Sequence, residues 1–399
     1  MPTLPPWTAS LDPAEFTRLI AWRRHLHAEP ELSFHEADTA AYVERALTEL
    51  GFGPVYQLGG HGRVAWVGSG DGPALMLRAD MDALPIQEQS GLPFASRRPG
   101  AMHACGHDTH TAVLLAIAAR LKAHEAALPR RVVLCFQPAE EVGQGAAAMI
   151  AEGLLDGTYA AGAPRVDRAL GLHVWSRDRT GHIVASPGPF MGTVDDFTVR
   201  VHGRGGHGAL PHQAKDAIVA ASAVVLALQT IASRRVDPLD PVVVTVGAFH
   251  GGSAFNVIAE EVTLRGTVRS YSDALGAEVP VLVREVAMAA AQAYGCSAEV
   301  DYQRHAVALH NDTETAAWVR EAAHGVPGVT GVDGTYRLLA GEDFAWYLKR
   351  VPGCFFFVGC GGPDGPSEPH HSPRFRVDEA ALPVAAEVML RSAARCLVA

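Results

Sequence analysis

Short apolar segments alternate with longer segments of helical periodicity along the first half of this chain. This alternation limits the possible fold classes more than any other feature of the sequence. The short segments have the length of strands, and the longer ones carry apolar residues at helical spacing. Strands are expected at residues 63–67, 74–77, 132–136 and 169–172, and helices at residues 12–27, 33–50 and 111–128. Such alternation is typical of a largely parallel sheet with helices on its faces. We therefore predict an α/β fold for this part of the chain.

The second of these helices is expected to begin at a capping box. Ser33 is followed three residues later by Glu36, the spacing at which a hydroxyl and a carboxylate cap a first helical turn reciprocally. Apolar residues recur at helical spacing after this pair, and Gly51 stands where a helix ends. We therefore predict that Ser33 and Glu36 cap this helix.

The middle of the chain changes in character, which predicts a second domain. Its strand-like and helical segments follow the order β-α-β-β-α-β, which is that of a ferredoxin-like α+β unit. An apolar strand at 354–358 and a closing helix then resume the earlier α/β pattern. A chain of 399 residues is also too long for one ordinary domain. We predict a discontinuous domain of residues 1–187 and 306–399, interrupted by an inserted domain of residues 188–305.

The composition argues against several classes of protein. Hydrophobic residues make up 48% of the chain, and the net charge of −10 comes without a basic block, which argues against a nucleic-acid partner. No run approaches about 18 apolar residues, so we expect no membrane-spanning helix. Residues 1–6 lack the pattern of a signal peptide, and six scattered cysteines do not suit a disulfide scaffold. We therefore expect a cytoplasmic protein with free thiols.

Polar side chains of the metal-binding and acid–base kinds follow the ends of the expected strands. In open α/β sheets, ligands bind at the carboxyl ends of the strands, so these side chains should converge on one crevice. The groups are Asp80 with Asp82 after the second strand, Glu140 with Glu141 after the third, His173 after the fourth, segment 103–110 before a helix, and His371 after the last strand.

The residue types in these groups suit divalent metal ions. Thiolate, imidazole and carboxylate all bind Zn or related ions, and Cys105 and His107 are close enough in sequence for one turn to present both. Five or more ligands exceed the four of a closed structural site, which favours two ions roughly 3.5–4 Å apart. Such ions lower the pKa of a bound water toward about 7, and a general base must still take its proton. In the Glu140–Glu141 pair, one carboxylate can bind metal while the other acts as this base.

Each group taken alone has an ordinary structural explanation. Buried cysteine is usually a packing residue, adjacent glutamates are usually a solvated surface pair, and Asp80 and Asp82 could cap a turn. A lone histidine after a strand, such as His173, is more often a hydrogen-bonded core or surface residue. Because four polar groups follow four strands at the same edge of one sheet, we favour a shared site over four coincidences.

Ordered motifs along nearly the whole chain carry a family resemblance. They lie at residues 24–32, 78–85, 103–110, 136–141, 203–211, 255–258, 341–344 and 371–373. In these motifs the chain resembles amidohydrolases of the aminoacylase and carboxypeptidase metallopeptidase clan, in the branch with hippurate hydrolase, N-acetyldiaminopimelate deacetylase and plant auxin-conjugate hydrolases. The resemblance implies a zinc-peptidase-like catalytic domain, and it identifies the inserted domain as a dimerisation or lid domain.

The resemblance also implies roles for individual residues. Glu140 would be the general base. Asp82 would not bind the metal itself but would hold a ligand histidine in its orientation. His207 would reach the active site of the partner subunit and stabilise the oxyanion there. Asn256 would hold the scissile carbonyl, and Arg269 the substrate carboxylate, although Arg269 could equally be a strand residue facing solvent. The implied metal ligands are Cys105, His107, Glu141, His173 and His371, with Cys105 bridging the ions.

The function that follows is a two-metal amidohydrolase, which cleaves N-acetyl, benzoyl or similar N-acyl amino acids into a carboxylic acid and a free amino acid. The ions would be Zn or Mn, with Ni and Co as further options, and the enzyme would be a homodimer or higher homo-oligomer. The main alternative is a dipeptidase or aminopeptidase of the same clan. Peptidase members usually carry His in place of Asp80 and a bridging Asp in place of the thiolate, which disfavours that alternative.

Two alternatives from other classes are a metal-dependent binding or scaffold protein without turnover and a structural zinc site. The presence of Glu140 argues against the first, and the excess of open carboxylates argues against the second.

Overall fold

The computed structural model describes residues 5–70 and 72–398, and the chain divides into two compact units. The first unit comprises residues up to Gly188, His310–Arg337 and the chain from Asp343 onward. The second comprises Pro189–Leu309 and Leu338–Glu342. Residues 1–4, on which part of the signal-peptide expectation rests, lie outside the described residues.

The first unit is built on a mixed sheet that is mainly parallel at its centre. Among the described residues, its eight strands follow the order β1-β2-β4-β3-β5-β16-β6-β15. Strand β3 pairs in parallel with both β4 and β5, and β5 pairs in parallel with β16. This confirms the predicted α/β class. The strands are β1 (Tyr56–Leu58), β2 (Gly62–Val67), β3 (Ala74–Asp80), β4 (Val132–Gln137), β5 (Val166–Trp175), β6 (His182–Val184), β15 (Gly331–Asp333) and β16 (Gly353–Gly359).

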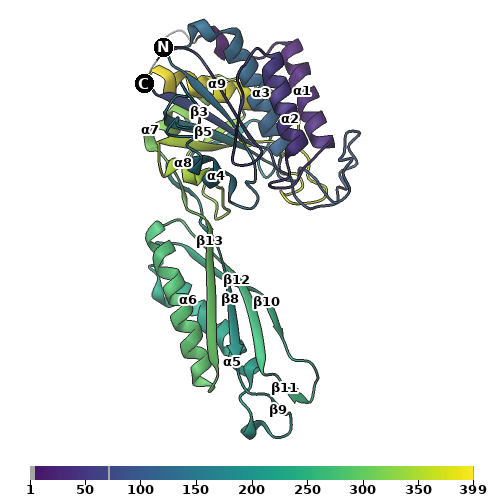
Figure 1. The fold of residues 1–399 in the computed structure, drawn as a ribbon, viewed down its shortest axis with the longest axis vertical. Helices are drawn as coiled ribbons and strands as arrows, with labels where there is room; N and C mark the ends of the chain where they lie inside the picture. The colour runs from purple at the N-terminus through teal and green to yellow at the C-terminus, as the bar shows by residue number, and fades with distance from the viewer. Residues whose placement is uncertain (1–4, 71, 399) are drawn as a thin grey trace. The chain divides into compact units, whose positions relative to one another are not determined.

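Helices cover both faces of this sheet. Figure 1 shows α3 and α9 on one side of the sheet and α4 and α8 on the other. Helix α3 is buried continuously from His107 to Leu121, as expected for a helix enclosed on all sides. The helices are α1 (Pro13–Ala28), α2 (Ala37–Glu49), α3 (His107–Ala123), α4 (Gly145–Ala151), α7 (Thr313–Ala323), α8 (Ala345–Leu348) and α9 (Ala381–Val398).

The predicted capping box at Ser33 and Glu36 is wrong. Helix α2 begins at Ala37, and its N-cap residue, Glu36, makes no capping hydrogen bond with its side chain. The N–H of Thr39 in the first turn is accepted instead by the Glu31 carboxylate at 2.8 Å. The reason is that Ser33 and Glu36 bond to residues distant in sequence, at the candidate site. The reciprocal capping box lies instead at the start of α1, between Asp12 and Glu15.

The second unit is an antiparallel sheet with two helices packed on one face. Its strands follow the order β10-β12-β8-β13, and with α5 and α6 they give the predicted β-α-β-β-α-β succession. Alternate strand residues pack with the apolar faces of α5 and α6 in one core. The elements are β8 (Val194–His202), α5 (Ala217–Thr230), β10 (Val242–Gly251), β12 (Glu261–Ser270), α6 (Asp273–Ala293) and β13 (Ser297–Ala306), with the short strands β9 (Gly206–His207) and β11 (Val257–Ile258). The short strands β7 (Gly188–Met191) and β14 (Leu309–Asn311) contain residues of both units.

The units differ from the predicted boundaries in three places, the smallest being the end of the first unit at Gly188 rather than at residue 187. Strand β13 continues to Ala306, so the second unit extends to Leu309 rather than ending at residue 305. The segment Leu338–Glu342, which the sequence pattern placed in the first domain, also belongs to the second unit. It is tied there by the bond from the Gly192 N–H to the Ala340 carbonyl, 2.9 Å long.

One expectation about membranes needs correction. By length and composition the helix Ala217–Arg235 is apolar enough to cross a membrane, although the chain has no long uninterrupted apolar run. The helix is apolar on average because its polar residues are few and mostly uncharged. Ala221, Val224 and Leu228 of this helix pack in the core of the second unit, so the helix is weak evidence for a membrane span.

Candidate metal centre

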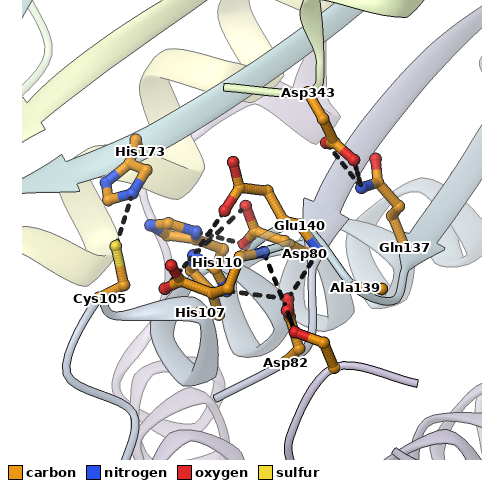
Figure 2. Close-up of polar contacts among 12 residues, drawn as sticks. Asp80, Asp82, Cys105, His107, His110, Gln137, Ala139, Glu140, His173 and Asp343 are labelled. Carbon is orange, nitrogen blue, oxygen red and sulfur yellow. Dashed lines mark hydrogen bonds and ion pairs between the residues drawn. The ribbon is translucent and has the colours of Figure 1, made fainter. Parts of the chain in front are cut away.

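The first unit gathers Asp, Glu, His and Cys side chains where its central parallel strands end. Asp80 is the last residue of β3, and it lies opposite Gln137, the last residue of β4. His173 lies near the end of β5, and His107 is the first residue of α3. Because the carboxyl ends of parallel neighbours meet at one edge, these side chains point toward a common region (Figure 2).

The structure brings the predicted metal ligands together. Ligand atoms of Cys105, Glu141 and His371 lie within 4.8 Å of one another. His107 forms a second such group with Glu140 and Glu141, so Glu141 belongs to both. His173 lies against Cys105, with 3.3 Å between its Nε2 atom and the sulfur. The five residues come from four separate parts of the chain.

The ring of His173 is held in one orientation. Its Nδ1 atom lies 2.6 Å from the carbonyl oxygen of Val174, so Nδ1 carries the proton and donates it there. This tautomer leaves the Nε2 lone pair facing the Cys105 sulfur. Burial, followed by the neighbouring imidazoles of His110 and His370, holds the pKa of His173 well below its ordinary value. A neutral imidazole with a free Nε2 is the form that binds metal ions.

The ring of His107 is oriented by Asp82. Its Nδ1 atom lies 3.3 Å from Asp82 Oδ1, while its Nε2 atom faces carboxylate oxygens of Asp80, Glu141 and Glu140 at 3.7, 3.8 and 4.0 Å. Burial opposes protonation, but Asp80 and the other carboxylates outweigh it and raise the pKa of His107 to about 10. The imidazole is thus surrounded by negative charge.

The buried Asp82 carboxylate accepts four hydrogen bonds from residues in and beside the cluster. Its Oδ1 atom accepts the N–H of Glu140 at 3.1 Å in addition to the His107 ring. Its Oδ2 atom accepts the N–H of Glu141 at 3.0 Å and the hydroxyl of Ser33 at 2.6 Å. These donors favour the ionised carboxylate, so the pKa of Asp82 is lowered despite its burial. One buried side chain therefore positions both adjacent glutamates and the imidazole.

The charges of the cluster call for a cation. Burial and the Glu141 and Glu140 carboxylates hold the pKa of the Cys105 thiol well above its ordinary value, and burial raises the pKa of Glu141 to about 7. In the described part of the chain, the buried atoms His107 Nε2 and Glu141 Oε1 have no hydrogen-bond partner. Orphaned buried atoms of this kind need an explanation, and a bound ion is one. Such a cation would reverse both pKa shifts and use both atoms, so these residues fit a metal-binding site.

Two residues beside the cluster were not assigned a role from the sequence. His110 donates from Nδ1 to Asp80 at 2.6 Å, and its Nε2 atom accepts the N–H of Val174 at 2.9 Å. Asp80 also accepts from the buried guanidinium of Arg78 at 2.6 Å. The charges of His107 and Arg78 outweigh burial and hold the pKa of Asp80 well below its ordinary value. The only signal for His110 was its place in the segment 103–110, three residues after His107.

His370 is the second such residue. A ligand atom of His370 groups with Cys105 and His173, within 4.8 Å of both. Its Nε2 atom accepts the N–H of Ser176 at 3.1 Å, and its ring stacks on Trp175 with the centroids 4.7 Å apart. The family resemblance singled out the adjacent His371 as a ligand, and nothing in the sequence indicated that His370 also faces the cluster.

The remaining predicted residues lie in the second unit. His207 is an exposed residue of β9 and pairs with Val257 of β11. The N–H of Gly208 donates to the Asn256 carbonyl at 2.8 Å, so His207 and Asn256 lie together. Arg269 is the last residue but one of β12. Its Nη1 atom donates to the Thr267 hydroxyl and to the carbonyls of Val268 and Asp195. The structure thus groups His207 with Asn256, and it places Arg269 apart from them.

This fold and cluster are those of an α/β hydrolytic enzyme with a metal-binding site at the carboxyl edge of its sheet. The chain belongs to peptidase family M20/M25/M40, whose model matches residues 76–395. This confirms the family resemblance seen in the motifs.

Named relatives cover most of the chain. It is 41% identical over 383 residues to the N-acetyl-L-cysteine deacetylase of Bacillus subtilis (95% of this chain, 88% of the relative). It is 43% identical over 285 residues to the N-acyl-L-amino acid amidohydrolase of Geobacillus stearothermophilus (71% and 75%). It is 37% identical over 388 residues to an IAA-amino acid hydrolase, ILR1-like 4, of Arabidopsis thaliana (96% and 86%). These names favour the predicted amidohydrolase over the dipeptidase alternative.

A solved structure supports the assignment to this family. The YXEP protein of Bacillus subtilis, described as a dinuclear metal binding peptidase from the M20 family, is 34% identical with a TM-score of 0.83. The alignment covers 97% of this chain and 99% of that protein.

Proposed function

We propose that this protein hydrolyses the amide bond of N-acyl amino acids, releasing a carboxylic acid and a free amino acid. The observation that carries the proposal is the group of Cys105, Glu141 and His371, joined through Glu141 to His107 and Glu140, in a chain whose relatives bear amidohydrolase names. The first unit is the catalytic domain in this proposal, and the second is the dimerisation or lid domain.

Two divalent ions per subunit are part of the proposal. Cys105, His107, Glu141, His173 and His371 would hold them. When bound, such ions polarise the amide carbonyl and lower the pKa of an attacking water. Zn and Mn suit the donor set of thiolate, imidazole and carboxylate, and Ni or Co would also be accepted.

Glu140 is the general base in the proposed reaction. Its backbone is fixed by Asp82, and its carboxylate faces the cluster, 4.0 Å from His107 Nε2. Glu140 takes a proton from the attacking water and delivers it to the amide nitrogen as the carbon–nitrogen bond breaks. Asp82 keeps the His107 ring and the Glu140 backbone in place during both transfers.

The second unit completes the site in a homodimer. His207 of the partner subunit would donate to the oxyanion that forms on the carbonyl, and Asn256 would hold the same carbonyl. Their position side by side and the exposure of His207 support this role. Arg269 would bind the substrate carboxylate, because among the described residues only its Nη1 atom makes hydrogen bonds, and its other guanidinium nitrogens can donate to a ligand. A cytoplasmic location completes the proposal.

A substrate screen tests the proposed activity. Metal-reconstituted enzyme is assayed with N-acetyl, N-benzoyl and indole-acyl amino acids, varying the acyl group and the amino acid separately, and with unblocked dipeptides. We expect turnover of blocked substrates that have no free amino group. Hydrolysis of dipeptides alone would establish the peptidase alternative, and undiminished hydrolysis in Glu140→Gln would remove the proposed base.

A further inference from the structure

The segment that contains Ser33 and Glu36 has a use that helix capping does not explain. Ser33 bonds to Asp82, 49 residues away, and Glu36 bonds to Ala139, 103 residues away. Glu36 is fully buried, and one of its carboxylate oxygens accepts the N–H of Ala139 at 2.8 Å. Its other oxygen is buried and finds no hydrogen-bond partner in the described part of the chain. The buried carboxylate therefore stabilises the backbone at Ala139 and does not cap helix α2.

Ala139 has an unusual backbone conformation. Its φ angle is +54°, in the left-handed region that residues with a side chain rarely adopt. Such a conformation persists only where neighbouring contacts hold it. The turn it makes directs the next two N–H groups, those of Glu140 and Glu141, toward the two oxygens of Asp82.

Three consecutive N–H groups are thus held by two carboxylates. Glu36 accepts from residue 139, and Asp82 accepts from residues 140 and 141. Ser33 completes the arrangement, because its hydroxyl fixes the Asp82 oxygen that accepts from Glu141. Figure 2 shows Ala139 and Glu140 beside Asp82, at the end of the strand that carries Gln137.

We propose that Ser33 and Glu36 are positioning residues for the general base and the adjacent metal ligand, acting through Asp82 and Ala139 on the backbone of Glu140 and Glu141. The inference rests on the proposed function, since it takes the roles of the two glutamates from there. Without the Glu36 acceptor, nothing else in the described structure bonds the Ala139 N–H, and the turn relaxes toward an ordinary conformation. Both glutamate side chains then lose their fixed direction.

The test compares two variants of similar size, of which only one keeps an oxygen acceptor. Glu36→Gln keeps a side-chain oxygen for the Ala139 N–H, whereas Glu36→Met fills the same space without one. Each is purified as the full chain, checked for thermal unfolding and reconstituted with Mn²⁺. The readouts are kcat and KM on an N-acyl amino acid, and Mn²⁺ affinity by calorimetry.

We expect Glu36→Gln to stay within about threefold of the natural enzyme and Glu36→Met to lose about 10- to 100-fold in both kcat and Mn²⁺ affinity, with KM little changed. Rescue by the glutamine would separate positioning from bulk stability. The inference is overturned if the two variants behave alike, whether both are active or both impaired.

A second pair covers the case in which Glu36→Met does not fold. Ser33→Ala removes the hydroxyl that fixes Asp82, and Ser33→Thr keeps one. We expect the alanine variant to bind Mn²⁺ about tenfold more weakly than the threonine variant, and equal affinities would overturn the inference. If the natural enzyme hydrolyses no N-acyl amino acid, the proposed function fails, while the Mn²⁺ affinities of both pairs still decide the positioning role.

Discussion

Replacing Asp82 with Asn is the perturbation whose effect follows most directly from the structure. Four donors converge on this carboxylate: the His107 ring and the Glu140 N–H on Oδ1, and the Glu141 N–H and the Ser33 hydroxyl on Oδ2. An amide has one acceptor oxygen, and its NH₂ group can only donate. Whichever way the introduced amide is turned, two of the four donors lose their acceptor.

The magnitude can be worked from those bonds. A hydrogen bond to a charged group contributes about 1.5–3 kcal/mol, and tenfold in affinity corresponds to about 1.4 kcal/mol. One amide orientation releases His107, and the other releases the backbone of Glu141. Since each is a proposed metal ligand, Asp82→Asn should weaken metal binding and lower kcat by about 10- to 100-fold.

The assay is calorimetric titration of the metal-free enzyme with Mn²⁺, paired with kcat on an N-acyl amino acid. Asp108→Asn is the matched control, because Asp108 is equally buried but bonds to Arg23 and His27 instead of the cluster. We expect the control to lose stability while the folded protein keeps Mn²⁺ affinity within about threefold. Metal affinity and kcat within about twofold of the natural enzyme in Asp82→Asn would refute the reasoning.

Three further predictions follow from the same structure. Glu140→Gln should lower kcat by about 10²- to 10⁴-fold and leave Mn²⁺ affinity nearly intact, whereas Glu141→Gln should weaken Mn²⁺ binding, as calorimetry would show. His207→Ala should lower kcat by about 10²- to 10³-fold, and mixing it with Glu140→Gln should restore part of the activity only if the imidazole acts across subunits. Burial raises the pKa of Glu36 to about 7, so the protonated side chain favours folding and this stabilisation is lost as the pH rises through that value. Denaturant unfolding of metal-free protein at about pH 5 and about pH 8.5 should therefore show the natural chain losing about 2–3 kcal/mol relative to Glu36→Gln, and parallel pH profiles would contradict it.

The sheet and the position of the cluster could be predicted because they depend on local patterns. Apolar runs such as the one in β4 are strands buried on both faces, and a parallel sheet puts the residues that follow them at one edge. The Asp80, Glu141 and His173 side chains, which lie at or near the ends of those strands, could therefore be placed near one another from the sequence pattern.

What the sequence could not predict depends on contacts between distant segments. Ser33 and Glu36 have the spacing of a capping box, and only the folded chain shows that Asp82 and Ala139 take their side chains instead. The partnership of His110 with Asp80 across 30 residues is of the same kind. So is the return of residues 338–342 to the second unit, which has no signal in composition or periodicity.

Anomalous X-ray diffraction from crystals grown with Mn²⁺ or Zn²⁺ tests the central claim most directly. The account predicts two anomalous peaks per subunit, with the Cys105 sulfur about 2.3–2.5 Å from both and His371 bound to one of them. Peaks that lie away from Cys105 and His371, or a single peak closed by four protein ligands, would contradict it.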